Sequence, residues 1–359
     1  MVLDSYKLKN TELKNRIVMA PLTRSRAIGN IPNELMAEYY SQRANSGLII
    51  TEGTTPSANG LGYARIPGAF SDAQIAGWKK VFEAVHEKAG KIFVQLMHCG
   101  RISAVQNLPE GSETIAPSAV LAVGEIHTDS DGMVGHDVPK EMTIADIDKV
   151  KTEYVNAAKR LVEAGADGIE IHSANGYLLN QFLNPKSNIR EDNYGGSIEN
   201  RCRFVLEIAT DVVEAIGADK VGIRFSPYGA FNDLEPYHNE VEAQFSYLAE
   251  KLKGLNITYI HMVDQRVAFT APDFKTDILG TIKKSFGGTI ISGGNVRSIE
   301  DAEVVINNGA DLVYVGRPYI SNPDLIYRFE NKLELANPNF DTFYTPGKEG
   351  YTDYSTASN

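Results

Sequence analysis

Residues 168–182 read GIEIHSANGYLLNQF, and this stretch changes character halfway along. Residues 168–171 alternate as a buried strand does, and His172, Asn175 and Tyr177 follow within six residues. An imidazole, an amide and a phenol are not needed to end a strand. We therefore expect the three side chains to face one ligand beyond the strand's carboxyl end. For any one of them alone, packing or capping of the strand remains the alternative.

Strand-like runs of this kind recur along the chain and alternate with helical segments. Near-continuous apolar runs are typical of strands buried on both faces. Eight are found, at residues 16–23, 48–54, 92–98, 167–173, 221–227, 259–264, 289–294 and 312–317. This alternation predicts a (β/α)8 TIM barrel. A doubly wound sheet would have a glycine-rich turn after its first strand, and Thr23-Arg24-Ser25 is not one.

Caps mark the boundaries of two of the predicted helices. Thr143 and Asp146 form a T-x-x-D capping box before a run of apolar residues at helical spacing, and Gly165 marks the end of that run. A second helix is predicted from the N-cap Ser197 to about Gly217.

Two connections between the predicted elements are long. Residues 99–142 have no helical period but contain the turn signal Asp131-Gly132, which predicts a β-hairpin excursion or capping subdomain after the third strand. Residues 174–196 follow the fourth strand as a second long loop. Loops of this length in a compact domain are usually functional. Because nothing marks a domain boundary, we expect one domain over residues 1–359.

Composition excludes several classes of protein. The 359 residues carry a net charge of −11, which argues against a nucleic-acid footprint or an anionic membrane surface, since both need clustered positive charge. No apolar run approaches the roughly 18 residues of a membrane span. Cys99 and Cys202 lie far apart, so we expect no disulfide framework and a reducing cytoplasm.

The expected active site is the rim formed by the carboxyl ends of the strands. The residues that reach it are Thr23, Gly53, Gln95, His98, His172, Arg224, Asp264, Gly293, Gly294, Gly316 and Arg317. In this fold the loops after strands seven and eight often bind phosphate, and here they carry three glycines and one guanidinium. The sequence therefore predicts a phosphate site, although tight turns alone could also use these glycines.

Arg224 is expected inside the barrel, where a cation is costly unless it meets an anion or acceptors. The residues leave two explanations open: a flat ligand across the barrel mouth, or an internal ion pair with Glu52 or Glu170.

Metal-assisted hydrolysis is the rival barrel chemistry. It would need several His and Asp residues at ligand spacing on early strands. His98, His172 and His261 do end strands, but carboxylates are sparse and the first strand offers none. We predict no metal site.

Five motifs resemble those of one family. They are RIVMAPLTR (residues 16–24), VQLMHCGRI (94–102), IHSANGYLLNQFLNPKSNIREDNYGGSIENRCRF (171–204), ISGGN (291–295) and VYVGRP (313–318). In this order they resemble the Old Yellow Enzyme family of FMN-dependent ene-reductases. The resemblance covers nearly the whole chain, through EGYTDY at residues 349–354.

The resemblance implies a tightly but non-covalently bound FMN on the barrel mouth. Residues along or around its ring would be Pro21, Leu22, Thr23, Gly53, Gln95 and Arg224, with Arg224 at the N1/O2 side of the ring. Its phosphate would be bound by Gly293, Gly294, Gly316 and Arg317. Thr23, where another branch carries Cys, places the chain with the classical branch.

The resemblance also implies substrate-binding and catalytic residues. His172 and Asn175 would hold the substrate oxygen, and Tyr177 would be the proton donor. Tyr63, Met97 and Tyr351 would line the pocket, and Met97 stands where many members carry Trp.

The implied activity is NAD(P)H-dependent reduction of activated C=C bonds in α,β-unsaturated carbonyl, maleimide or nitro compounds, in a ping-pong scheme. No G-x-G-x-x-G motif occurs, so NAD(P)H would bind over the flavin. A second FMN barrel reductase, of dienoyl-CoA or dihydroorotate type, is an alternative, although two isolated cysteines argue against an iron–sulfur centre. A flavin- or phosphate-binding barrel without turnover is another. We expect small-molecule substrates and a monomer or weak homodimer. The reductant is expected to be either NADH or NADPH.

Overall fold

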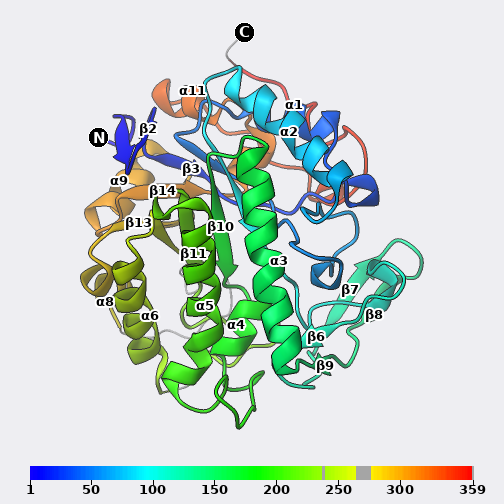
Figure 1. Cartoon of the computed structure of the whole chain (residues 1–359). Helices are drawn as coiled ribbons and strands as arrows, with labels where there is room; N and C mark the ends of the chain where they lie inside the picture. Colours follow the sequence, from blue (N-terminus) through cyan, green and yellow to red (C-terminus); the bar gives the residue numbers. More distant parts are fainter. Residues whose placement is uncertain (237–238, 264–275, 358–359) are drawn as a thin grey trace.

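The core of the molecule is a closed barrel of eight parallel strands (Figure 1). The computed structural model describes residues 1–236, 239–263 and 276–357. In chain order the strands are β3 (Ile17–Met19), β4 (Leu48–Ile50), β5 (Ile92–Leu96), β10 (Gly168–Ser173), β11 (Val221–Phe225), β12 (Tyr259–Met262), β13 (Thr289–Gly294) and β14 (Leu312–Val315). Each lies within one of the eight predicted runs, so the predicted TIM barrel is confirmed. The predicted rim residue Asp264 lies outside the described residues.

Helices surround the barrel and follow the strands in turn (Figure 1). They are α1 (Glu34–Gln42), α2 (Asp72–His86), α3 (Ile144–Glu163), α4 (Leu178–Leu183), α5 (Ile198–Ile216), α6 (Val241–Leu255), α8 (Ile278–Phe286), α9 (Ile299–Asn307), α10 (Pro318–Ser321) and α11 (Leu325–Glu330). The predicted caps are confirmed. Thr143 accepts from Asp146 N in a complete capping box, and Ser197 accepts from Asn200 N. None of the described helices is long and apolar enough to cross a membrane.

Glycines inside the barrel make room for two aromatic rings. A Cβ on Gly168 would lie 2.4 Å from the Phe93 ring, and a Cβ on Gly222 would lie 2.2 Å from the Tyr259 ring. The two rings lie 5.9 Å apart and fill the middle of the barrel below its mouth. This layer explains why two strand positions carry no side chain.

A hairpin at the N-terminus was not predicted from the sequence. Strands β1 (Tyr6–Leu8) and β2 (Thr11–Leu13) pair antiparallel. Leu8 and Leu13 are fully buried against the inward-facing side chains of the barrel strands. The hairpin therefore closes the end of the barrel opposite the mouth.

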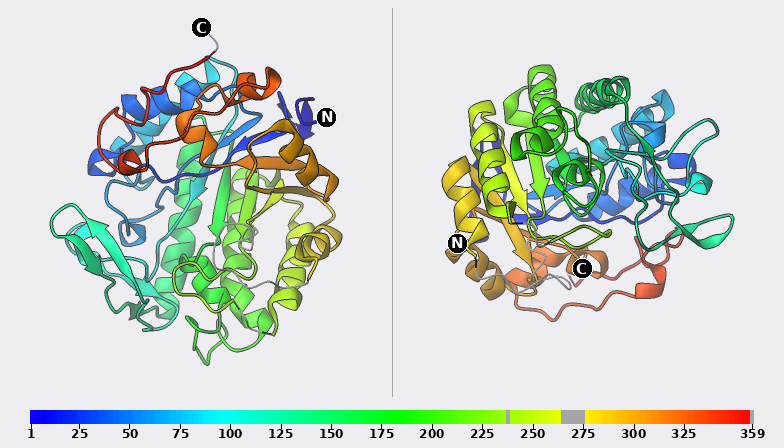
Figure 2. Two further views of the ribbon diagram at one scale, coloured as in Figure 1. Left: turned by 180° about the vertical axis from the view of Figure 1, so that it is seen from behind. Right: turned by 90° about the horizontal axis from the view of Figure 1, so that it is seen from below.

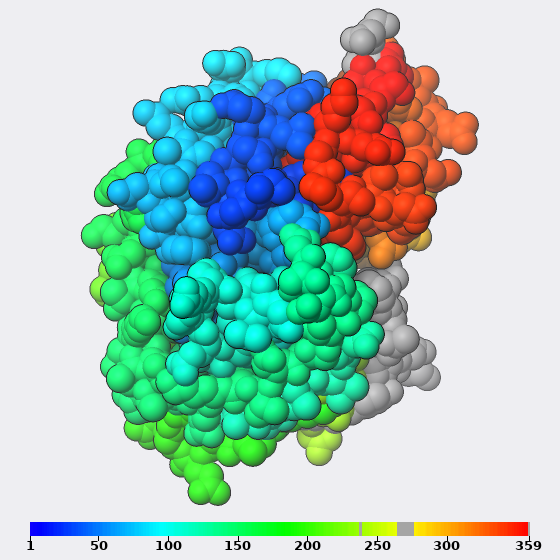
Figure 3. Space-filling view, turned by 90° about the vertical axis from the view of Figure 1, so that its right-hand side faces the viewer, coloured from blue at the N-terminus to red at the C-terminus, as the bar shows by residue number. Residues whose placement is uncertain are grey.

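The segment between β5 and α3 leaves the barrel as predicted and projects from its side (Figure 2). It holds the antiparallel hairpin β7 (Glu125–Thr128) and β8 (Gly132–Gly135), with the turn at the predicted Asp131-Gly132. Strands β6 (Ile115–Ala116) and β9 (Lys140–Glu141) pair at its base. On one face of the molecule this segment meets a blue, N-terminal part of the chain and the red C-terminal segment (Figure 3).

Arg65 holds these three parts together. Its guanidinium pairs with Asp129 in the hairpin turn and donates to the carbonyl oxygens of Ser25 and Tyr344, at 3.0 and 2.7 Å. Arg65 is therefore one of several side chains that fix the excursion against the barrel mouth. Asn107 of the excursion, for example, donates to Gly62 O at 2.8 Å.

We predict that Gly222→Ala destabilises the fold by about 1–3 kcal/mol, because its methyl group would overlap the Tyr259 ring in a packed core. Gly254→Ala is the matched control: it lies exposed in α6 with no neighbour within 4 Å and should stabilise by about 0.5–1 kcal/mol. Urea unfolding followed by circular dichroism measures both. Equal free energies of unfolding for the two variants would contradict the packing account.

Candidate active site

The end of β10 turns through two consecutive left-handed residues. Asn175 has φ +57° and Gly176 has φ +77°, and Tyr177 then caps the short helix α4. The sequence had predicted an uninterrupted loop over residues 174–196, so α4 is a difference. The turn brings His172 and Tyr177 together, with their rings edge to face and centroids 5.0 Å apart. Asn175 lies between them in the turn.

His172 is buried and is held in one tautomer. Its Nδ1 accepts a hydrogen bond from Ala174 N at 3.2 Å, so Nε2 carries the proton. Burial, followed by the charge of Arg224, holds the pKa of His172 well below its usual value. His172 is therefore a neutral hydrogen-bond donor through Nε2.

Tyr177 is a neutral phenol near the surface of the mouth. Its hydroxyl donates to Tyr63 OH at 3.1 Å. Burial and the neighbouring Tyr63 raise the pKa of Tyr177 well above its usual value. Tyr177 packs in one apolar cluster with Met97, Tyr63 and hairpin residues, including Ile126. The excursion thus forms one wall beside this phenol.

The loop between β11 and α6 supports the turn, and this loop was missed from the sequence. Asn232 Nδ2 donates to Asn175 O at 2.8 Å, and its side-chain hydrogen bonds lower the pKa values of both Tyr63 and Tyr177 against the effect of burial. A Cβ on Gly176 would lie 2.6 Å from Asn232 Cβ. The sequence signal that could have indicated a turn here is the pair Asn232-Asp233, because both residue types favour turns. In the structure both residues have positive φ.

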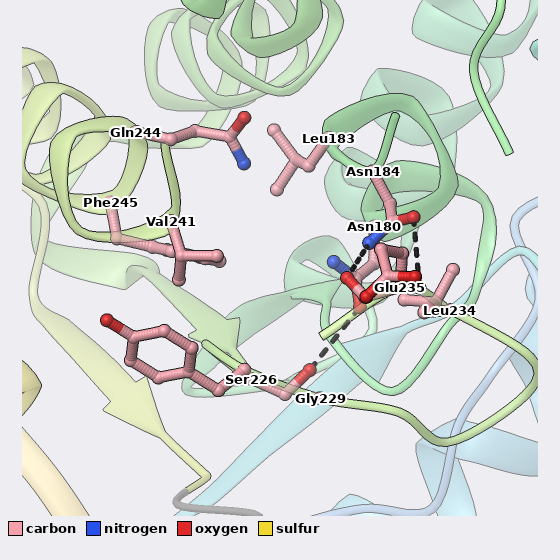
Figure 4. Close-up of a pocket in the computed structure, with 11 residues that line it drawn as sticks. Asn180, Leu183, Asn184, Ser226, Gly229, Leu234, Glu235, Val241, Gln244 and Phe245 are labelled. Carbon is pink, nitrogen blue, oxygen red and sulfur yellow. Dashed lines mark hydrogen bonds between the residues drawn. The ribbon is translucent and has the colours of Figure 1, made fainter. Parts of the chain in front are cut away.

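The same loop is fixed at its other side. Asp233 pairs with Lys186 at 2.5 Å and with the buried Arg101 at 3.6 Å. Beneath it, a small polar pocket joins the loop to α4 (Figure 4). There Asn184 exchanges two hydrogen bonds with the Glu235 backbone, and Ser226 Oγ donates to Asn180 Oδ1. Ser226 Oγ also accepts from Asn175 N at 2.8 Å, so this pocket positions the turn.

The floor of the mouth is polar. Gln95 Nε2 donates to Glu170 Oε1 at 2.7 Å, and His261 Nδ1 lies 2.9 Å from Glu170 Oε2. Arg224 is 7% exposed, its Nε has no hydrogen-bond partner among the described residues, and no carboxylate of those residues lies within 4 Å of its guanidinium nitrogens. The predicted alternative of an internal ion pair with Glu52 or Glu170 is therefore not found in the described part of the chain.

The first barrel strand opens onto the mouth at its carboxyl end. Pro21, Leu22 and Thr23 are partly exposed, between the buried Ala20 and Arg24. A Cβ on Gly316 would meet the side chains of Leu22 and Ala20 at 3.9 and 4.0 Å, which is ordinary van der Waals contact, and Gly316 is itself partly exposed. The ends of β3 and β14 thus border an accessible surface.

Gly293 and Gly294 of β13 were both predicted to bind phosphate, and each position needs a glycine for a different structural reason. A Cβ on Gly293 would lie 2.3 Å from Tyr314 O, so this glycine is required for packing against β14. Gly294 has φ +141°, a conformation that side chains rarely adopt. Arg317 is exposed and lies over the Phe340 ring at 5.8 Å, and it makes no ion pair within the described residues.

Gly53 and Met97 pack directly on each other. A Cβ on Gly53 would lie 2.5 Å from Met97 Sδ, and Met97 is 2% exposed. Gly53 therefore leaves the space that the buried Met97 side chain fills, and a side chain at residue 53 would overlap it.

The structure places Tyr351 differently from the expectation that it lines the pocket. Its ring is completely buried and stacks on Tyr39 of α1, with centroids 4.0 Å apart. Arg24 and Arg26 lie beside the ring at 5.2 and 4.8 Å. These buried cations need aromatic faces and carbonyl oxygens, which the C-terminal segment supplies. Tyr344 of that segment is instead 59% exposed, and its carbonyl oxygen accepts a hydrogen bond at 2.7 Å from Arg65, two residues after Tyr63.

No cluster of three or more His, Cys, Asp or Glu side chains suited to a metal ion occurs in the described part of the chain.

Comparisons with known proteins agree with this geometry. Residues 4–336 match the model of the NADH:flavin oxidoreductase / NADH oxidase family. The chain is 41% identical to enoate reductase 1 of Kluyveromyces lactis, over 99% of this chain and 94% of the relative. A solved structure of morphinone reductase in complex with tetrahydroNAD is 40% identical, with a TM-score of 0.93, and the match covers 100% of this chain and 98% of that one.

An old yellow enzyme homologue from Zymomonas mobilis is 37% identical, with a TM-score of 0.93 over 99% of both chains. The family match covers most of the chain, and the similarity to these relatives is close to full length on both sides. The chain therefore belongs to the NADH:flavin oxidoreductase / NADH oxidase family, the family of Old Yellow Enzyme.

Proposed function

We propose that the barrel mouth is the site where this chain performs the FMN-dependent reduction of activated C=C bonds with NAD(P)H. The substrates would be α,β-unsaturated carbonyl, maleimide or nitro compounds. The observation that supports this most is that two neutral donors lie side by side above the polar floor. They are the Nε2–H of His172 and the phenol of Tyr177, whose rings meet edge to face.

The residues of the mouth fit an FMN. Arg224 has a buried Nε without a partner among the described residues, as expected for a cation that meets the acceptors of a flat ring. Gln95 and Thr23 would contact the ring, together with Pro21, Leu22 and Gly53. Gly316 is partly exposed and carries no side chain, so a phosphate could approach its backbone N–H. Gly293, Gly294 and Arg317 would complete the phosphate site.

Bound FMN supplies the hydride, which it takes from NAD(P)H. His172 would donate from Nε2 to the substrate oxygen, and Asn175 would be the second donor. Fixed donors at an oxygen that gains negative charge stabilise the transition state, as an oxyanion hole does. Tyr177 would then donate its proton to the α-carbon, and its raised pKa keeps it protonated until that step.

The walls of the pocket come from segments far apart in the chain. We assign Tyr63 and Met97 to the wall beside Tyr177, because all three belong to one packed cluster. Tyr344 takes the place that the sequence assigned to Tyr351. The hairpin of residues 125–135 would act as a cap on this side, which makes residues 99–142 a capping subdomain of a single-domain chain.

The cellular setting is also a proposal. The net charge of −11 and the two buried, unpaired cysteines favour a cytoplasmic enzyme of the NADPH dehydrogenase type that acts on small molecules rather than on nucleic acid or membranes. A monomer or weak homodimer is the proposed assembly.

The first prediction separates the two half-reactions. Tyr177→Phe should leave FMN content and flavin reduction by NAD(P)H close to normal, because reduction of the cofactor needs no proton donor to carbon. Re-oxidation by an enone should slow by about 10²–10⁴, the usual contribution of a positioned acid. Anaerobic stopped-flow at the flavin band measures each half.

Tyr63→Phe is the matched control, because it removes the hydrogen-bond partner of Tyr177 and keeps the acid. Its re-oxidation should slow much less than that of Tyr177→Phe. If Tyr177→Phe slows both halves equally, or neither, Tyr177 is not the proton donor.

The phosphate assignment predicts a loss of cofactor affinity. Arg317→Ala should weaken FMN binding by about 1.5–3 kcal/mol, the contribution of a charge-assisted hydrogen bond. Fluorescence titration of the flavin-free protein with FMN measures this. Lys284→Ala, which removes one exposed cation on α8, is the control and should bind FMN as the parent does. Unchanged affinity in Arg317→Ala refutes the assignment.

The protonation state of His172 predicts how ligand binding depends on pH. Because burial holds its pKa well below the usual imidazole value, His172 stays neutral through the pH range around 6.5 in which a free imidazole titrates. Affinity of the FMN-loaded protein for a phenol that is itself un-ionised in this range should therefore be constant. Absorbance titration at several pH values is the measurement. A transition near pH 6.5 that disappears in His172→Asn would show that His172 titrates there.

A further inference from the structure

Glu170 is a buried carboxylate that the reaction above does not use. It lies on β10 two residues before His172, and both it and His261 are 0% exposed. A carboxylate in the floor of a barrel is costly unless several donors meet it. Its charge must therefore be stabilised by the groups around it.

The surroundings of Glu170 favour the ionised form. Burial raises its pKa, but His261, Arg224 and Gln95 together more than offset this effect, so the pKa of Glu170 lies below its usual value. Gln95 donates to one carboxylate oxygen at 2.7 Å and His261 meets the other at 2.9 Å. The carboxylate is thus negatively charged at neutral pH.

The charges of the floor balance each other. Arg224 is paired in strand register with both His172 and His261. Burial lowers the pKa of Arg224, and Glu170 is the main opposite charge that acts against this effect. Burial and the charge of Arg224 lower the pKa of His261 and outweigh the opposite effect of Glu170, so His261 is neutral at neutral pH. Among the described residues the floor carries one guanidinium and one carboxylate, with a net charge near zero.

Glu170 also fixes the direction of the Gln95 amide. Because Gln95 Nε2 donates to Glu170, its Oε1 faces away from this carboxylate and is left as the acceptor atom of the amide. A ring N–H placed beside Oε1 would meet an acceptor, and Arg224 on the neighbouring strand would meet acceptors of the ring.

We propose that Glu170 is a positioning residue that sets the reduction potential of the bound flavin. Its negative charge offsets that of Arg224 and thereby disfavours the extra electrons of the reduced ring, while it holds the Gln95 amide in the orientation that binds the ring. This inference rests on the proposed function, since it needs a flavin at the mouth.

Glu170→Gln removes the charge and keeps the shape. Arg224 is then uncompensated and favours the negatively charged reduced flavin. At a fixed ambient potential the ratio of reduced to oxidised flavin should rise at least tenfold, which is about 30 mV for a two-electron couple. Anaerobic titration against a reference dye measures this ratio directly, with no turnover of substrate.

Glu170→Asp and Phe93→Leu are the controls. The first keeps the charge and the second changes the neighbouring ring of the layer below, so both should keep the ratio within threefold of the parent. A rise in both controls equal to that in Glu170→Gln would mean that any disturbance of the floor shifts the potential, and this would overturn the charge argument.

An uncompensated Arg224 could also prevent Glu170→Gln from folding. The pair Arg224→Gln and Arg224→Gln/Glu170→Gln covers this case, because the double variant has a neutral floor. Removing the carboxylate within this pair should again raise the reduced fraction at least tenfold. If both comparisons are made with FMN bound and the reduced fraction rises in neither, the proposed role of Glu170 is overturned while the proposed function stands. A parent protein that binds no FMN would instead overturn the proposed function on which it rests.

Discussion

The site depends on the backbone turn at the end of β10. Two consecutive left-handed residues, Asn175 and Gly176, reverse the chain within one turn, so that a strand residue and a helix cap face the same space. Such a conformation costs free energy for any residue other than glycine. It is stabilised here from outside, because Asn232 and Ser226 hydrogen-bond to the two backbone groups of Asn175. The geometry of His172 and Tyr177 therefore depends on a loop about 50 residues later in the chain.

A second constraint is the layering of the barrel interior. The aromatic layer of Phe93 and Tyr259 fits only because Gly168 and Gly222 have no side chains. Above it, Glu170, Gln95, Arg224 and His261 form a polar layer in which Gln95 and His261 each hydrogen-bond to Glu170. A buried guanidinium with an unpartnered Nε among the described residues is expensive in a closed core but suits a floor that receives a flat polar ligand. Packing below and charge balance above thus prepare one face for a cofactor.

Many of these features could be predicted from the sequence, because they depend on residues that are close together in the chain. The eight strands and the caps at Thr143 and Ser197 depend on nearby residues, and each is confirmed. His172, Asn175 and Tyr177 lie within six residues, so their convergence could also be inferred. Their chemical roles, and those of the proposed FMN-binding residues, remain predictions.

What could not be predicted depends on contacts between distant segments. The support from Asn232 becomes visible only when the loop after β11 lies against Gly176. Tyr344 and Tyr351 are seven residues apart in one C-terminal segment, and the buried Arg24 and Arg26 decide which of them turns inward. The hairpin of β1 and β2 likewise has too few residues to show a period, and its role follows from closing the barrel.

The most direct test of the central claim is the visible spectrum of the purified protein under anaerobic conditions. The account predicts a yellow protein whose flavin band is bleached by NADH or NADPH and restored by an enone in excess. A protein that stays colourless after incubation with FMN would contradict the assignment of the barrel mouth as a flavin site. A yellow protein that neither nicotinamide bleaches would contradict its assignment as a reductase.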